Sequence, residues 1–208
     1  MKKNWSLFFK IFITITSFIS IYLNFKAFTI KEAMLYYTVQ SNVLCFLFYL
    51  VTIILYLSGK LKKNNVYYVI KGFVTMAITV TMFIYQIVIA NSSNAYQEYE
   101  LACTFAHLVV PILVISDYLI FGEKGNLKKN YPLIWSISLI SYVIFDIIYV
   151  MLGGTFQDGS IYPYFYMNIE KYGLLQVMIN CFMIYALFVL YGVIVQIIDK
   201  KLGNLRTK

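Results

Sequence analysis

Six long apolar stretches constrain this chain more than any other feature of its sequence. They lie at residues 6–25, 33–58, 66–90, 101–121, 131–152 and 173–198. A helix that crosses the hydrocarbon core of a bilayer needs about 20 mostly apolar residues, and each stretch has that length. Strands of a membrane β-barrel are about 10 residues long and alternate in polarity, unlike these continuous runs. The sequence therefore predicts an all-α integral membrane protein with six transmembrane helices.

The overall composition also favours a membrane protein over a soluble one. Hydrophobic residues make up 61% of the 208 residues and charged residues 12%, against roughly 25% charged in a typical soluble domain. The net charge of +8 does not indicate nucleic acid, because the lysines lie in short connections between the apolar runs. Three cysteines without CxxC spacing indicate neither a disulfide framework nor a structural zinc site. We expect one domain over 1–208, no nucleic-acid partner and no cofactor.

Lysine and arginine are divided unevenly between the two sets of connections. Fourteen of the 17 lie near the N-terminus, around 59–71, in the 122–130 connection and in the C-terminal tail, whereas Lys26, Lys31 and Lys171 lie elsewhere. Because cytoplasmic loops are enriched in Lys and Arg, this pattern predicts that both termini are cytoplasmic. Abundant Lys, Ile, Asn and Tyr with one arginine are typical of an AT-rich bacterial genome, so we expect a multi-pass protein of a bacterial cytoplasmic membrane.

The longest connection, residues 153–172, contains the aromatic run YPYFYMNIEKY and is expected on the outer side. Two interpretations stay open for it. The aromatic side chains lie at the headgroup level as a belt, or they fold back as a lid over a site between the helices.

Three ionisable residues stand out within the apolar stretches: His107, Asp117 and Asp146. Such residues cost about 2.5–3.5 kcal/mol at the bilayer centre and usually face the protein interior. Asp117 lies near the cytoplasmic end of its stretch, close to the lysines of the 122–130 connection, which favours a structural role. His107 and Asp146 each lie about two turns below the outer surface, ~9 Å from the ends of their stretches at 1.5 Å per residue. These two side chains can therefore meet at one depth.

Three further stretches place polar side chains in the same outer layer. At helical spacing, each set shares one face of its helix. The sets are Thr38, Ser41, Asn42 and Cys45; Thr75, Thr79, Met82 and Gln86; and Gln176 and Asn180. Such hydroxyls and amides often only bond the backbone or join helices. Because five helices and the single histidine coincide in depth, we expect a polar pocket that opens toward the outer leaflet.

A histidine beside a hydroxyl is the minimum for nucleophilic acyl transfer, because the imidazole takes the hydroxyl proton while the oxygen attacks a carbonyl. We expect Thr38 or Ser41 as the nucleophile and His107 as the base. Asp146 orients His107, holds a water or bonds a tyrosine of its own helix. Amide donors stabilise the oxyanion in such sites. The candidate donors are Asn42, Gln86 and Asn180.

Three alternatives stay open. A mixed metal site of Cys103, His107, Asp146 and Cys181 is compatible with their depth, but a single histidine argues against it and no metal is expected. A non-catalytic binder or transporter of a small amphipathic ligand predicts a cavity continuous toward the cytoplasmic side and lined by Asp117. A purely structural polar core predicts no cavity large enough for a ligand.

Three motifs resemble those of a known family. YYTVQSN at 36–42, HLVVPILVISDYLIF at 107–121 and YPYFY at 162–166 follow the order of the bacterial six-span branch of the androgen-induced (FAR-type) membrane hydrolase family. The resemblance covers nearly the whole chain, and TxQSN with a downstream HxxxP is its more specific part. Animal members hydrolyse fatty-acid esters of hydroxy fatty acids with an intramembrane threonine and histidine. These match Thr38 and His107.

The resemblance implies an intramembrane Thr–His hydrolase that acts on a lipid ester, with acyl transfer as a related outcome. Gln40, Ser41 and Asn42 are interpreted as a feature of the bacterial branch, an oxyanion or a headgroup contact. Bacterial members carry an acid after the YPY motif where this chain has Asn168, so a role for that acid does not transfer.

Overall fold

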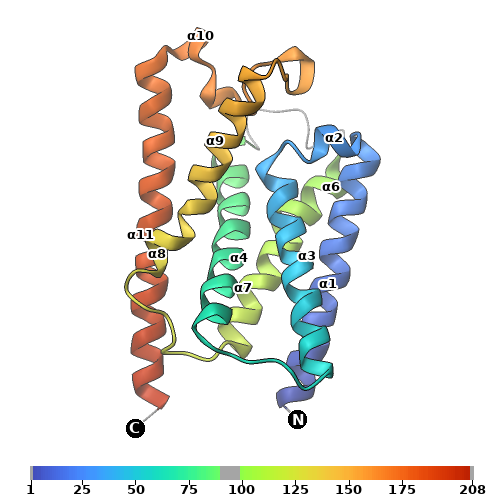
Figure 1. The fold of residues 1–208 in the computed structure, drawn as a ribbon, viewed down its shortest axis with the longest axis vertical. Helices are drawn as coiled ribbons and strands as arrows, with labels where there is room; N and C mark the ends of the chain where they lie inside the picture. The colour runs from blue at the N-terminus through green and yellow to red at the C-terminus, as the bar shows by residue number, and fades with distance from the viewer. Residues whose placement is uncertain (1, 90–98, 207–208) are drawn as a thin grey trace.

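The computed structural model describes residues 2–89 and 99–206, and every regular element within them is helical. Six helices are long and apolar enough to cross a membrane, as predicted: Asn4–Ala27, Tyr37–Leu57, Asn65–Ile87, Glu100–Phe121, Tyr131–Met151 and Leu174–Leu205. The helices run side by side, and both chain ends lie at the same end of the bundle (Figure 1). This arrangement is expected of an even number of crossings.

Several of these spans contain more than one helical element. The first described range, residues 2–89, contains α1 (Lys2–Ala27), α2 (Ile30–Ala33), α3 (Tyr37–Leu57), α4 (Asn65–Ile84) and the π-helical η1 (Tyr85–Ile89). The fourth and fifth spans are α6 (Glu100–Thr104), the π-helical η2 (Phe105–Val109) and α7 (Val110–Phe121), then α8 (Tyr131–Trp135) and α9 (Ile137–Met151). The last elements are η3 (Gln157–Gly159), η4 (Phe165–Met167), α10 (Ile169–Tyr172) and α11 (Leu174–Arg206).

The second span begins later than the sequence predicted, at Tyr37 instead of residue 33. Thr29 and Glu32 form a reciprocal capping box, which makes α2 a separate short helix. The chain then turns, and Tyr36 is extended with φ −97° and ψ 136° before α3 begins. The apolar run was continuous across this corner, so hydropathy alone did not reveal the break. The corner places Thr38 in the first turn of α3.

The sixth helix is longer than predicted, because α11 continues beyond residue 198 to Arg206. Its 33 residues span ~50 Å at 1.5 Å per residue, well above the ~30 Å of a bilayer core. The extension is anchored by Asp199, which accepts hydrogen bonds from the backbone N–H groups of Gly125 and Leu127. The third predicted stretch ended at residue 90, which lies outside the described residues.

Helix α4 lies at the centre of the bundle and contributes to two apolar clusters. On one side Val74 and Ile78 pack with residues of α1, α3 and α7. On the other side Met76 and Ala77 pack with α8, α9 and α11. A Cβ added to Gly72 would clash with the ring of Trp135, so this glycine lets α8 approach α4 closely.

The outside of the bundle is covered by large apolar side chains. Met151, Leu152, Phe182 and Leu187 are each more than 60% exposed. An exposed apolar surface this extensive is unfavourable in water and matches a lipid environment. Together with the six apolar helices, it is the surface of a multi-pass membrane protein.

Candidate functional site

Thr38 and His107 meet across the bundle, although 69 residues separate them in the chain. The Thr38 Oγ1 lies 3.2 Å from the His107 Nε2, at hydrogen-bond distance. Thr38 comes from the first turn of α3 and His107 from η2 in the middle of the fourth span. Helix α3 begins in the half of the bundle that is remote from the termini, on the side where α2 and α6 lie (Figure 1).

The second ring nitrogen of His107 fixes which nitrogen carries the proton. Its Nδ1 lies 3.0 Å from the backbone carbonyl oxygen of Cys103, and a carbonyl only accepts. The Nδ1–H therefore donates to Cys103, which leaves Nε2 as the acceptor for the Thr38 hydroxyl. A backbone carbonyl orients the imidazole, so Asp146 does not fill that role.

Two π-helical turns face each other at this point. His107 lies in η2 and Tyr85 opens η1, and their rings stack with centroids 3.8 Å apart and planes 20° apart. Both side chains are buried. Single π-helical turns in membrane and soluble helices are often found at functional sites, because they displace side chains from the regular α-helical path. The stack holds the imidazole plane while the Cys103 carbonyl sets its rotation.

An apolar cavity of about 310 Å³ opens beside Thr38. Its walls come from α3, α4, α9, α11 and the connection between α9 and α11. The lining includes Thr38, Thr81, Ile144, Tyr164, Tyr166 and Phe182. Ile144 and Phe182 are more than half exposed on the outside of the bundle, so the cavity borders the lipid-facing surface between α9 and α11. This cavity is large enough for part of an acyl chain, unlike the closed packing that a purely structural polar core predicts.

The aromatic run of the 153–172 connection lies over this cavity. Tyr164 and Tyr166 line it, and their rings stack 5.4 Å apart and nearly parallel. Tyr164 also packs edge-on against Tyr36 at the α2–α3 corner, and its hydroxyl interacts with the side chain of Thr38. Of the two interpretations left open by the sequence, this contact pattern favours a cover over the site. The YPY motif was the signal that pointed to Tyr164, whose contact with Thr38 was not predicted.

The three polar residues that follow Thr38 stabilise the site's framework. The Gln40 side-chain amide donates to the carbonyl of Met34, within the α2–α3 corner. The Ser41 hydroxyl lies 2.7 Å from the hydroxyl of Thr81 on α4. The Asn42 amide donates to the carbonyls of Thr38 and Ala106, at 2.8 and 3.3 Å. Since these donors are already engaged, the structure does not place Ser41 as a nucleophile or Asn42 as a free oxyanion donor.

Asp146 is buried on α9, apart from His107. Its side chain interacts with the hydroxyl of Tyr142, one turn earlier on α9, as one of the three expected roles required, and Tyr164 is close enough for electrostatic interaction. The Tyr142 hydroxyl donates to the carbonyl of Leu35, and that of Tyr149 donates to Thr155. Of the three expected roles, orienting His107 is wrong. Asp146 instead lies beside the tyrosines that cover the cavity.

The other two predicted amide donors do not reach Thr38. Gln86 is exposed on η1 and does not line the cavity. Asn180 accepts a hydrogen bond from Gln176 one turn earlier, as their shared face predicted, and donates to the carbonyl of Tyr166 at 3.0 Å. Asn180 therefore positions the cavity cover instead of contacting a reacting group.

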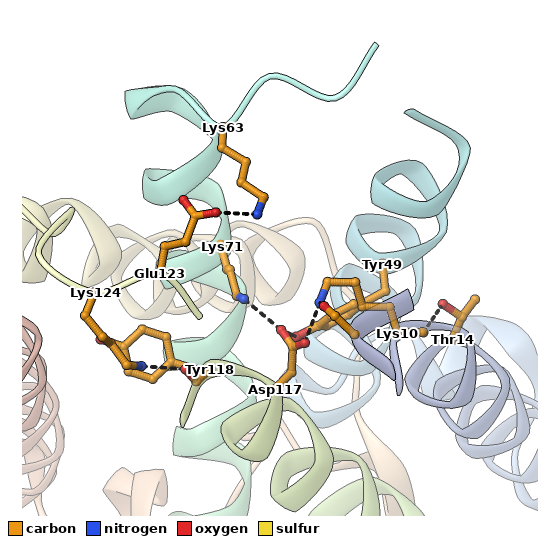
Figure 2. Close-up of polar contacts among 10 residues, drawn as sticks. Lys10, Thr14, Tyr49, Lys63, Lys71, Asp117, Tyr118, Glu123 and Lys124 are labelled. Atoms are coloured by element: carbon orange, nitrogen blue, oxygen red, sulfur yellow. Dashed lines mark hydrogen bonds and ion pairs between the residues drawn. The ribbon is translucent and has the colours of Figure 1, made fainter. Parts of the chain in front are cut away.

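Asp117 has a structural environment, but its partners differ from the lysines that the sequence suggested. Its carboxylate is fully buried between Lys10 Nζ at 2.6 Å and Lys71 Nζ at 2.7 Å (Figure 2). The Tyr49 hydroxyl donates to the same carboxylate at 3.1 Å. These partners come from α1, α3 and α4, because helix packing brings them closer than the connection that follows α7. Asp117 does not line the cavity beside Thr38.

In the described ranges no three His, Cys, Asp or Glu side chains come together as a metal centre would require.

Comparisons with protein-family models, with curated proteins and with solved structures give no match for this chain. The similarity to the androgen-induced hydrolase family therefore stays a prediction from the sequence motifs.

Proposed function

We propose that this chain is an intramembrane hydrolase of lipid esters, with Thr38 as the nucleophile and His107 as the general base. The observation that carries the proposal is the 3.2 Å contact between the Thr38 Oγ1 and the His107 Nε2 at the wall of a 310 Å³ apolar cavity. The acyl chain of the substrate lies in that cavity and enters from the bilayer between α9 and α11. The ester carbonyl then lies at the Thr38 hydroxyl.

The arrangement supports a two-step acyl transfer. The Thr38 oxygen attacks the ester carbonyl while its proton passes to the His107 Nε2. Collapse of the tetrahedral intermediate breaks the bond to the alcohol oxygen, which leaves with the proton from His107. Water then attacks the acyl-threonine with His107 again as the base, which releases the fatty acid and restores the Thr38 hydroxyl.

Tyr164 is the donor best placed for the oxyanion of this intermediate. Its hydroxyl interacts with the Thr38 side chain, and burial raises its pKa above the ordinary value. The phenol therefore keeps its proton at neutral pH and can donate to a carbonyl oxygen that develops negative charge. The amides predicted for this role are engaged elsewhere or exposed.

A binder or transporter of an amphipathic ligand is the alternative function. This alternative predicts a cavity that continues toward the end of the bundle carrying the termini and that is lined by Asp117. Asp117 is instead enclosed by two lysines and a tyrosine, and it does not line the cavity. This observation favours the hydrolase. The proposed setting is a bacterial cytoplasmic membrane with both termini in the cytoplasm, as the lysine distribution predicts.

The test is labelling of the detergent-purified protein with a fluorophosphonate probe, combined with release of fatty acid from ester-containing liposomes. We expect the wild type to be labelled on Thr38 and both signals to disappear in Thr38→Ala and His107→Ala. Thr79→Val is the matched control, because it removes a buried hydroxyl that bonds the Thr75 carbonyl and does not line the cavity beside Thr38. Labelling that persists in Thr38→Ala, or a wild type with neither signal, would overturn the proposal.

A further inference from the structure

A second group of polar residues lies toward the end of the bundle that carries the termini, remote from Thr38. Figure 2 shows Lys10 and Lys71 on either side of Asp117, with Lys63 paired to Glu123 nearby. The side chains of Lys10 and Lys71 are only 12% and 9% exposed. This group takes no part in the proposed hydrolysis.

Two small cavities adjoin these lysines, with volumes of about 40 and 100 Å³. Both are lined by Ser6, Lys10, Lys63 and Tyr67. The larger one is well above the ~10–15 Å³ that a single water needs, so it has room for a small polyatomic group. The largely buried ammonium group of Lys10 and the partly exposed one of Lys63 thus border the same space. The hydroxyl groups of Ser6 and Tyr67 border it as well.

The charges around these cavities do not balance. Among the described residues, the ammonium groups of Lys10, Lys63 and Lys71 face the carboxylates of Asp117 and Glu123, which leaves one positive charge in excess. The 122–130 connection contains no acid besides Glu123, so it does not remove this excess. A buried charge without a counter-charge is costly, so an anion at this position is strongly favoured. Lys10 borders both cavities, whereas Lys71, which is slightly more buried, borders only the smaller one.

The donors present suit a group with several acceptor oxygens. Lysine binds phosphate as a point charge with three N–H donors. The Lys10 Nζ donates to the Ser6 Oγ at 2.8 Å, so the hydroxyl hydrogen of Ser6 is available to a further acceptor. Apolar residues complete the larger cavity, and Trp5 and Phe8 on the same part of α1 are more than 60% exposed. This mixture of ammonium, hydroxyl and apolar groups is what the interface of a bilayer requires.

We propose that Lys10 and Lys63, together with Ser6 and Tyr67, form a binding site for a phosphate group. The phosphate belongs to the headgroup of an anionic phospholipid or is a free phosphate ion. Anionic lipids of the cytoplasmic leaflet attract basic residues next to membrane helices. The site is separate from the Thr38–His107 pair and does not depend on the proposed hydrolysis.

The experiment measures binding to the full-length protein in detergent micelles by native mass spectrometry and by the shift of the thermal unfolding midpoint. The probes are phosphatidylglycerol, phosphatidylcholine and inorganic phosphate. We expect Lys10→Gln to weaken phosphatidylglycerol binding about tenfold, because a hydrogen bond to a charged group contributes about 1.5 kcal/mol or more. This variant keeps the pair between Lys71 and Asp117. Lys171→Gln is the matched control, since Lys171 lies near the other end of the bundle over the Tyr172 ring.

The outcomes separate the two sources of phosphate. Binding of phosphatidylglycerol but not of inorganic phosphate, lost in Lys10→Gln, assigns the site to a lipid headgroup. Binding of inorganic phosphate with the same dependence on Lys10 assigns it to free phosphate. Lys63→Gln repeats the test at a side chain that is 41% exposed and therefore not needed for folding. Equal binding of both lipids, or binding that neither variant changes, would overturn the proposal.

Discussion

Replacing Asp117 by asparagine removes the charge that the two buried lysines share. The carboxylate is 0% exposed, and it accepts from Lys10 at 2.6 Å, Lys71 at 2.7 Å and the Tyr49 hydroxyl at 3.1 Å. Breaking one buried ion pair by removing a partner costs about 3–5 kcal/mol, because the other charge is left uncompensated. Here two ammonium groups are left, so we expect Asp117→Asn to destabilise the protein by about 4 kcal/mol or more.

Thermal unfolding in detergent, followed by circular dichroism, measures this loss, and Glu123→Gln is the matched control at the same end of the bundle. Glu123 pairs with Lys63 at the same 2.6 Å, but the two side chains are 51% and 41% exposed. Exposed pairs contribute about 0–1 kcal/mol, so the control should unfold close to the wild type. Adding Lys71→Met to Asp117→Asn should recover part of the stability. Equal stability of Asp117→Asn and Glu123→Gln would refute the reasoning.

Three further predictions concern the cover, the helix packing and pH. Tyr164→Phe should lower kcat of ester hydrolysis by about 10²–10³ with little change in KM, because it removes one oxyanion donor, and steady-state kinetics checks this. Gly72→Ala should destabilise the bundle by about 1–3 kcal/mol, because the new Cβ meets the Trp135 ring, and combining it with Trp135→Phe should restore part of the unfolding temperature. The hydrogen bond from Lys63 holds the pKa of Glu123 below its ordinary 4.5. The stabilising contribution of Glu123 is therefore complete above pH 4.5 and lost as the pH falls through the lowered pKa, so unfolding temperatures of the wild type and Glu123→Gln should converge on acidification.

The membrane-spanning architecture was predictable because it depends on the length and hydropathy of each stretch. The boundaries at the α2–α3 corner and at the end of α11 were not, because both depend on contacts. At the corner the capping box of Thr29 and Glu32 interrupts a continuous apolar run. At the end of α11, Asp199 and the 122–130 connection stabilise turns that hydropathy assigned to a tail.

The candidate site was predictable in part. Depth and helix-face spacing brought Thr38 and His107 into one layer, and the structure places them in contact. The same reasoning left Asp146 open as a partner of His107, because it used depth without rotation about the helix axis. Rotation depends on packing, and it turns Asp146 toward tyrosines of the cover. The partner that does orient His107 is a backbone carbonyl, which no side-chain pattern can reveal.

The π-helical turn that carries His107 has a consequence for how this chain tolerates change in length. A π turn contains one residue more than an α turn, so η2 is equivalent to a single-residue insertion in the fourth span. Deleting one residue between 105 and 109 would restore an α turn while the two halves of the span keep nearly the same relative rotation, so the change would be confined to the turn that carries His107. The hydrogen bond between the Cys103 carbonyl and the His107 imidazole would then be lost, although every remaining amino acid is unchanged. In this stretch the number of residues determines the position of His107 beside Thr38 as strictly as the identity of those residues does.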